Sequence, residues 1–208
     1  MSAAREGGLT SPTAPHAADD AREVELSLQE PERFGVLFDR YFAEIHAYLA
    51  ARLGRDAADD LAAETFLTAF RKRQGFDPAR GVVRGWLYGI ATRHMSRYRR
   101  REVREYRAMS RTAGQVPEES PADRITDRVS AGASRPQLAS ALAQLSRGDR
   151  EVLLLVALAG LGHAEVAAAL GIPYGTVCSR LNRVRRKLRG ALADVSPTFK
   201  EDPGEWMS

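Results

Sequence analysis

The segment PYGTVCSRLNRVRRKLRG, residues 173–190, concentrates positive charge and contains no carboxylate to balance it. At about 100° per residue, its apolar side chains fall within a stripe about 60° wide, which predicts a helix with one narrow buried edge formed by Val177, Leu181, Val184 and Leu188. The other faces are cationic and hold Arg180, Arg183, Arg185, Arg186, Lys187 and Arg189. Like charges four residues apart on a helix repel one another. The pattern therefore favours a polyanionic partner over a plain solvated surface.

The residues just before this helix, GLGHAEVAAALGIPYGTV, have the pattern of a helix-turn-helix. Gly171 can adopt the left-handed turn, and Thr176, which follows Pro173, is a candidate N-terminal cap of the second helix. In this motif the second helix enters the major groove of DNA with its first residues against base edges. We expect base contacts from Cys178, Ser179, Asn182 and Arg183. Phosphate contacts are expected mainly from Arg180, Arg185, Arg186, Lys187 and Arg189.

A second cationic segment, RGWLYGIATRHMSRYRRREVR at 84–104, interleaves arginines with Trp86, Tyr88 and Tyr98. Aromatic rings beside guanidinium groups suit unstacked bases, because each stacked base contributes about 1–3 kcal/mol without sequence preference. Trp86 also has the helical spacing of Leu87 and Ile90, so core packing is its favoured role. Core packing does not explain the arginines, which therefore favour contact with nucleic acid.

The segment RDAADDLAAETFLTAF, residues 55–70, is acidic instead. Asp60 and Glu64 share a helix face by their spacing, away from Leu61 and Phe66. Taken alone, such a ridge is more typical of a solvated face than of a docking surface.

These segments require helices to position them, and we expect an all-α chain of two small domains. Apolar residues recur at helical spacing over 31–107, with breaks at Gly54 and at GFDP (75–78), and again over 138–192. Residues 108–137 are polar and interrupted by proline and glycine, which predicts a flexible linker. Residues 1–30 are expected to form a disordered tail. Residues 193–208 are expected to form a short C-terminal tail with no assigned function.

The distribution of charge limits the function. The net charge is only +4, but residues 1–70 carry thirteen acidic and six basic groups, whereas residues 71–107 carry three acidic and twelve basic groups. Such segregation suggests an acidic surface for a protein partner and a basic one for nucleic acid. Lone Cys178 and the absence of a long apolar segment lead us to expect a soluble cytoplasmic protein. The four histidines are scattered, and no phosphate-binding loop is present, so we expect no enzyme, no metal ion and no cofactor.

Three motifs together resemble the extracytoplasmic-function (ECF) group of bacterial sigma-70 family RNA polymerase sigma factors. They are DDLAAETFLTAF, WLYGIATRHMSRYRRR and LSRGDREVLLLVALAGLGHAEVAAALGIPYGTVCSRLNRVRRKLR, in this order, and the similarity spans about residues 31–192. The resemblance implies a region 2-like domain and a region 4-like domain with the helix-turn-helix. It also implies promoter recognition with core RNA polymerase, and regulation by an anti-sigma factor.

The resemblance also assigns residues to partners. Asp59, Asp60 and Glu64 would dock on the clamp helices of the largest polymerase subunit, and the second domain would contact the flap of the second-largest subunit. The minus-ten promoter element would be read by Arg84, Trp86, Arg93, His94, Arg97, Arg99 and Arg100. The minus-thirty-five element would be read by Thr176, Cys178, Ser179, Arg180, Asn182, Arg183, Arg186 and Lys187.

Three positions depart from the family pattern. Ala63 stands where glutamine is common in the docking motif, which removes a polar contact but keeps the acidic pair. Arg93 stands where asparagine is common, and Cys178 where arginine or lysine is common, so the base preferences at both promoter elements are expected to be unusual. A redox role for Cys178 is a minority hypothesis. Two other functions remain open, a stand-alone helix-turn-helix regulator and a general RNA-binding helical protein. A stand-alone regulator would need neither the acidic ridge nor the segment at 84–104.

Overall fold

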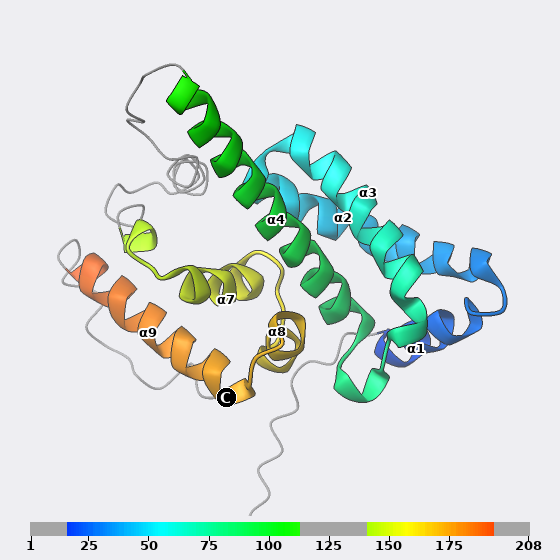
Figure 1. The fold of residues 1–208 in the computed structure, drawn as a ribbon. Helices are drawn as coiled ribbons and strands as arrows, with labels where there is room; N and C mark the ends of the chain where they lie inside the picture. The colour runs from blue at the N-terminus through cyan, green and yellow to red at the C-terminus, as the bar shows by residue number, and fades with distance from the viewer. Residues whose placement is uncertain (1–15, 113–140, 194–208) are drawn as a thin grey trace, which may run out of the picture.

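The computed structural model describes residues 16–112 and 141–193, and these residues form helices and turns without a β-strand. The helices are α1 (Ala17–Leu26), α2 (Phe34–Leu53), α3 (Arg55–Lys72), α4 (Val83–Thr112), α7 (Arg147–Ala157), α8 (His163–Leu170) and α9 (Tyr174–Ala193). The long helix α4 runs diagonally between two groups of helices, α1–α3 on one side and α7–α9 on the other (Figure 1). None of the helices in the described ranges is long and apolar enough to cross a bilayer.

Helices α2, α3 and α4 form the core of the first domain, as the apolar spacing predicted. Leu37 and Ile45 of α2 and Leu87 of α4 are fully buried. Gly54 ends α2 with a φ of 90°, a backbone conformation that glycine adopts without steric cost. Between α3 and α4, two short 3₁₀ turns cover Arg73–Gly75 and Pro78–Arg80, at the break predicted around GFDP.

The prediction that residues 1–30 form a disordered tail is wrong for α1, because Ala17–Leu26 form a helix that packs on α2. Asp20 is buried, and its carboxylate accepts hydrogen bonds from the guanidinium of Arg40 and the hydroxyl of Tyr41, both on α2. Val24 is buried beside them, and Arg73 donates from Nε to the carbonyl of Ser27 at 3.2 Å. A single buried aliphatic side chain gives little apolar periodicity, so sequence analysis had almost no signal for this helix. Residues 1–15 lie outside the described residues.

The second domain consists of α7, α8 and α9. The hydroxyl of Ser146 accepts a hydrogen bond from the backbone N–H of Asp149 at 3.2 Å and caps α7. At the start of α8, the carboxylate of Glu165 accepts from the N–H of Gly162 at 2.8 Å. Gly171 has a φ of 64° between α8 and α9, as the helix-turn-helix pattern predicted. Val166 and Val177 are fully buried between these helices.

The two domains pack against each other, with α8 lying on α4. Three glycines at four-residue spacing, Gly81, Gly85 and Gly89, permit this close approach. A Cβ atom added to Gly89 would lie 2.6 Å from the carbonyl oxygen of Ala169, and one on Gly85 would lie 3.4 Å from that of Glu165. Buried apolar side chains of both domains therefore belong to one continuous cluster.

The expected boundaries of the linker and the C-terminal tail are only partly visible. Helix α4 continues to Thr112, beyond the boundary expected at residue 107. Residues 113–140, which include most of the expected linker, lie outside the described residues, as do residues 194–208.

Candidate nucleic-acid interface

Helix α9 has the buried edge that its sequence predicted. Val177, Leu181 and Val184 are buried, and Leu188 is partly buried. The helix begins at Tyr174, so Thr176 lies inside its first turn and is not the N-terminal cap. The cause is Pro173, whose carbonyl oxygen accepts from the N–H of Thr176 at 2.9 Å and starts the helix earlier.

Three of the cations on α9 bind to the second domain itself. Arg183 Nη2 lies 2.9 Å from Asp149 Oδ1, Arg180 Nη1 donates to the carbonyl of Gly148 at 3.4 Å, and Lys187 Nζ donates to the carbonyl of Gln144 at 3.1 Å. The hydrogen bond from Arg183 is the main reason why the pKa of Asp149 lies below its ordinary value. Arg183 was expected to be a base reader and Lys187 a phosphate contact; here Arg183 forms an ion pair with a carboxylate and Lys187 a hydrogen bond to a backbone carbonyl.

The remaining predicted residues of α9 are more open. Ser179, Asn182 and Arg186 are exposed, whereas Thr176 and Cys178 are half-buried. Ser179 donates its hydroxyl to the carbonyl of Thr176 at 3.0 Å. Arg185 and Arg189 are exposed as well. The outward face of α9 therefore offers an amide, a hydroxyl and guanidinium groups to a partner.

Helix α4 exposes a row of arginines along its length. Arg93, Arg97 and Arg100 are exposed. Arg93 and Arg100 each donate from Nε to the carbonyl four residues earlier, Gly89 and Ser96, at 3.0 and 3.1 Å. This contact orients each guanidinium along the helix and uses only one of its five N–H donors. Most of the donors remain available to an anion.

Arg84 is instead held between the two domains. Its Nε donates to Glu44 of α2 at 3.0 Å, and its Nη2 donates to the carbonyl of Ala159, just after α7. Its Nη1 lies 4.0 Å from Glu165 of α8. The Arg84 side chain is only 18% exposed, so most of it is engaged by these partners and little of it is open to DNA.

Arg99 is also turned inward, toward a buried ionic cluster that joins the domains. Arg52 of α2 donates from both terminal nitrogens to the carboxylate of Glu151 on α7, each at 2.8 Å. Arg99 Nη1 lies 4.0 Å from the same carboxylate. Burial, followed by repulsion from Arg52, lowers the pKa of Arg99 to about 10. Arg99 is thus partly occupied by the second domain.

The aromatic side chains of α4 have different environments. Trp86 is half-buried against Phe76, with ring centroids 5.1 Å apart. Tyr88 is buried edge-on against Tyr48, which prevents it from stacking on a base as sequence analysis suggested. Sequence analysis also missed Phe76, Asp77 and Arg80, which lie on the loop before α4 and line the same cleft as Trp86. The only available signal was the break at GFDP.

His94 faces α3 and not the arginine row. Its Nε2 lies 2.9 Å from the hydroxyl of Thr68, and its Nδ1 lies 3.3 Å from Glu64. Burial lowers the pKa of His94, and the nearby carboxylate of Glu64 only partly opposes this effect. The structure therefore associates His94 with the acidic ridge, although sequence analysis grouped it with the arginines.

The predicted acidic ridge lies on the outer face of α3. Asp59, Asp60 and Glu64 are all exposed, and Asp59 Oδ1 lies 2.6 Å from Nε2 of His46 on α2. Two large apolar side chains of the first domain, Phe38 and Leu67, are 40% and 48% exposed. The ring of Phe38 packs edge-on against Phe66. We call the exposed set Phe38, Asp59, Asp60, Glu64 and Leu67 the acidic–apolar face.

Comparisons with known proteins match both domains. Residues 37–105 match Sigma-70 region 2, and residues 135–188 match Sigma-70, region 4. The chain is 31% identical over 186 residues to the RNA polymerase sigma factor CnrH of Cupriavidus metallidurans, which covers 86% of this chain and 96% of that protein. It is 35% identical over 181 residues to the ECF RNA polymerase sigma factor SigL of Mycobacterium tuberculosis, with 86% and 99% covered.

The fold agrees with these matches. The solved structure of CnrH in complex with the cytosolic domain of CnrY is similar with a TM-score of 0.58 and 25% identity, covering 85% of this chain and 99% of that one. The matches extend across both domains in order, which a stand-alone helix-turn-helix regulator does not explain. The chain belongs to the ECF group of the sigma-70 family of RNA polymerase sigma factors.

Proposed function

We propose that this sigma factor docks on core RNA polymerase through its acidic–apolar face and recognises promoter DNA through α4 and α9. The observation that carries the proposal is the separation of charge on the first domain. The carboxylates of Asp59, Asp60 and Glu64 are exposed on α3, and Arg93, Arg97 and Arg100 are exposed on α4. A domain arranged in this way can contact a basic protein surface and a nucleic acid at the same time without competition between them.

The acidic–apolar face has the composition of a protein interface. Phe38 and Leu67 supply exposed apolar area, and Asp59, Asp60 and Glu64 supply exposed carboxylates. Apolar anchors within a polar rim are typical of stable contacts between proteins. The clamp helices of the largest polymerase subunit are the proposed partner. For the second domain the proposed partner is the flap of the second-largest subunit, with Leu158, which is 47% exposed, as a candidate contact.

The two DNA-reading surfaces differ in chemistry. On α4, Arg93 lines the same cleft as Trp86, and Arg97 and Arg100 are exposed further along the helix. Arginines and an aromatic ring on one helix suit the unstacked bases of an opened minus-ten element. On α9, Asn182 and Arg186 are exposed on a helix of the size that enters the major groove of a duplex minus-thirty-five element. The chain acts by binding, and association with core polymerase would place it in the cytoplasm.

An anti-sigma factor is a further proposed partner. The relative CnrH is described in complex with CnrY, and this chain has the same two-domain fold. The exposed Phe38 and Leu67 would suit such a partner as well as the polymerase. Competition between the two would then control when the sigma factor is active.

Polymerase docking can be tested with a matched pair of charge reversals. Asp60→Arg places a cation in the acidic–apolar face, whereas Glu25→Arg makes the same change of charge at an exposed position on α1. We expect Asp60→Arg to weaken co-purification with core polymerase and run-off transcription by roughly tenfold or more, since truncating central interface residues often costs about 2 kcal/mol. Glu25→Arg should leave both unchanged.

Two results would contradict the proposal. The first is equal polymerase binding by the Asp60→Arg and Glu25→Arg variants. The second is selective promoter binding by the wild-type chain alone with no gain from core polymerase, which would be the behaviour of a regulator.

A further inference from the structure

Two adjoining cavities lie between the two domains along α4, and we call them together the interdomain groove. The wider part has a volume of about 810 Å³ and lies between Trp86 on α4 and Tyr174 at the start of α9. The narrower part has a volume of about 320 Å³ and is lined by Arg147 at the start of α7. Arg93 and Ile172 line both parts, so the two parts meet at these residues. Volumes of this size are typical of sites for small molecules.

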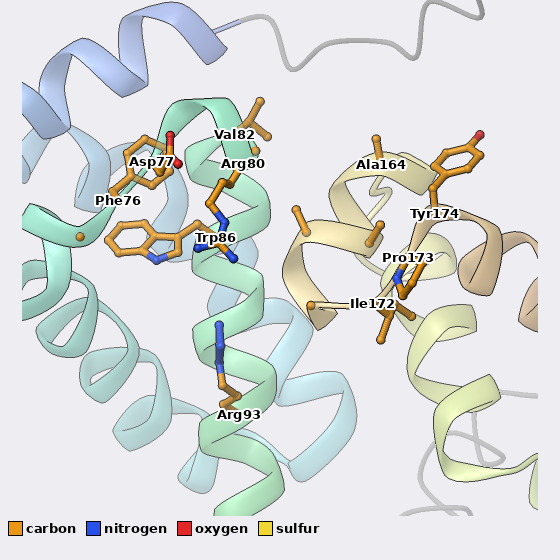
Figure 2. A pocket seen from close by; sticks show the side chains of 15 residues that line it. Phe76, Asp77, Arg80, Val82, Trp86, Arg93, Ala164, Ile172, Pro173 and Tyr174 are labelled. Carbon is orange, nitrogen blue, oxygen red and sulfur yellow. The ribbon is translucent and has the colours of Figure 1, made fainter.

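The wider part offers aromatic surfaces on opposite walls. Trp86 is half-buried and packs on Phe76, with ring centroids 5.1 Å apart. Tyr174 is 49% exposed. Figure 2 shows Phe76 and Trp86 on one wall and Tyr174 on the other. Such rings suit a planar heterocycle, because every nucleobase presents a π-face for stacking.

The narrower part is cationic, and its lining includes Arg93, Arg147 and Arg180. None of the three forms an ion pair within the part of the chain that the structure describes. Arg93 donates to the carbonyl of Gly89 at 3.0 Å, and Arg180 donates to the carbonyl of Gly148 at 3.4 Å. A peptide carbonyl does not neutralise a guanidinium charge. The N–H donors that these contacts leave over have the geometry that phosphate oxygens accept.

The first turn of α7 adds backbone donors to the same wall. Gly148 lines the narrower part, and the N–H groups of the first residues of a helix, here Arg147 and Gly148, have no acceptor within the helix. The helix dipole also favours an anion at this end. The carboxylate of Glu151 lines the narrower part as well, but it accepts two hydrogen bonds from Arg52. The net charge of the lining residues therefore remains positive.

The two parts of the groove differ in charge, which gives a ligand a direction. Asp77 and Arg80 both line the wider part, so their charges oppose each other there. A carboxylate repels phosphate but accepts hydrogen bonds from sugar hydroxyls. A ligand with a planar base and an anionic tail would therefore place its base in the wider part and its tail in the narrower part.

We propose that the interdomain groove binds a nucleoside 5′-diphosphate. The base lies between Trp86 and Tyr174, and the diphosphate binds Arg93, Arg147 and Arg180. Three guanidinium groups exceed the charge of a single phosphate, which is about −2, and so favour a diphosphate. The inference goes beyond the proposed function, since it concerns a small molecule bound by the chain without DNA or polymerase.

Single-stranded DNA offers the same chemistry of base and phosphate. Trp86 and Arg93 are proposed minus-ten residues, so an unstacked DNA strand could use them too. Arg147 and Tyr174 belong to no proposed promoter contact. These two residues therefore distinguish a nucleotide in the groove from a DNA strand on α4.

Isothermal titration calorimetry on the full-length chain tests the site, with ADP, adenosine and inorganic pyrophosphate as probes. We expect ADP to bind saturably at a single site. Adenosine and pyrophosphate should each bind at least about tenfold more weakly, since each fills only one part of the groove. ADP should also raise the melting temperature of the chain, because the site exists only in the folded state.

Variants on the second domain locate the bound nucleotide. Arg147→Gln removes an exposed guanidinium and should weaken both ADP and pyrophosphate by about tenfold, since hydrogen bonds to charged groups are strong. Tyr174→Leu should weaken ADP by about tenfold and leave pyrophosphate unchanged. Arg22→Gln makes the same loss of charge at an exposed position of α1 outside the groove and should change neither.

Four results would overturn the proposal. ADP does not bind, or Arg147→Gln and Arg22→Gln lower ADP binding equally, which would mean general attraction to a cationic chain. Pyrophosphate binds as tightly as ADP, which would leave only a site for a plain anion. Arg147→Gln weakens a short single-stranded oligonucleotide as much as ADP, which would assign the groove to DNA.

Failure of the proposed function gives a different result. The chain would then bind ADP as expected, with the losses described for Arg147→Gln and Tyr174→Leu, but would neither bind core polymerase nor direct transcription.

Discussion

Asp20 shows how a single buried carboxylate can fix a helix that has little apolar surface. It is 1% exposed and accepts hydrogen bonds from Arg40 and Tyr41. Burial, followed by the hydrogen bond to Asp20, raises the pKa of Tyr41, so the hydroxyl remains a donor at neutral pH. The position of α1 on α2 therefore depends on polar contacts as much as on Val24.

Replacing this carboxylate should cost a measurable part of the stability. Asp20→Ala leaves the buried hydroxyl of Tyr41 without its acceptor, and we expect the free energy of unfolding to fall by about 2 kcal/mol. Asp19 is exposed on the same helix, so Asp19→Ala should change it by less than about 0.5 kcal/mol. Urea denaturation measures both values. Equal effects would mean that α1 is not anchored by Asp20.

His94 should make stability depend on pH. Burial lowers its pKa, while the attraction of Glu64 opposes this and Arg97 reinforces it. The folded state therefore favours the neutral imidazole. The contribution to stability is complete above the ordinary histidine pKa of about 6.5 and is lost as the pH falls toward the folded value.

This dependence can be isolated with His94→Gln, which keeps a polar side chain but does not titrate. We expect the wild-type melting temperature to fall more steeply than that of the variant as the pH is lowered from 7 to 5. Parallel pH profiles of wild type and variant would show that His94 is not the titrating group.

At the scale of the element, α4 and the turn before it approach α8 closely through glycine. Gly81 has a φ of 148°, and a Cβ there would lie 2.9 Å from Cβ of Ala168. Gly89 lies even closer to the backbone of α8, with Ala169 O at 2.6 Å from the position of an added Cβ. Backbone atoms cannot move aside as the end of a long side chain can. Glycine at position 89 therefore sets how closely α8 approaches.

Gly89→Ala should force α8 away from α4. We expect a loss of about 1–3 kcal/mol, the usual cost of overpacking, in denaturation of the full chain. Gly35 on α2 is the matched control because a Cβ there would meet nothing within 4 Å. Gly35→Ala should be neutral or stabilising by up to about 1 kcal/mol, since alanine favours the helix. Similar values for both variants would remove the argument for a tight α4–α8 contact.

Apart from α1, the helices were predictable because each buries a periodic apolar face. Leu37 and Ile45 on α2 and Val177 and Val184 on α9 are buried as their spacing requires. The packing of the two domains was not predictable in this way. This packing depends on glycines, which add nothing to a pattern of apolar side chains. It also depends on Arg52 and Glu151, and charged residues are normally expected at the surface. Of the candidate site, the exposed arginines and the acidic ridge were recognised, but the internal contacts of Arg84, Arg99 and Arg183 depend on residues distant in the chain.

At the scale of the whole molecule, a buried ion pair connects the two domains. Arg52 on α2 and Arg99 on α4 lie 2.8 and 4.0 Å, nitrogen to oxygen, from the carboxylate of Glu151 on α7. Removing one member of a buried ion pair leaves the other charge uncompensated. The charge of Glu151 should therefore help to hold the two domains together.

Acidic pH provides a test of this balance. Burial alone would raise the pKa of Glu151. The hydrogen bonds and charge of Arg52, together with the charges of Arg99 and Arg147, lower it by more, so the net pKa lies below its ordinary value. The stabilisation that Glu151 gives to the packing of the two domains is therefore present above the ordinary glutamate pKa of about 4.3 and is lost as the pH falls through the lower folded value. Protonated Glu151 leaves the cations of the cluster without a counter-charge, so the domains should separate. Small-angle scattering from pH 7 to 3 should show this expansion in the wild-type chain.

Glu151→Gln supplies the matched control, because it has the shape of protonated glutamic acid at every pH. We expect this variant to be expanded already at pH 7 and to show a smaller change on acidification, while circular dichroism reports that both chains keep their helices. If the variant is as compact as wild type at pH 7, the charge of Glu151 does not hold the domains together. In that case the glycine contacts of α4 alone would account for the packing of α8.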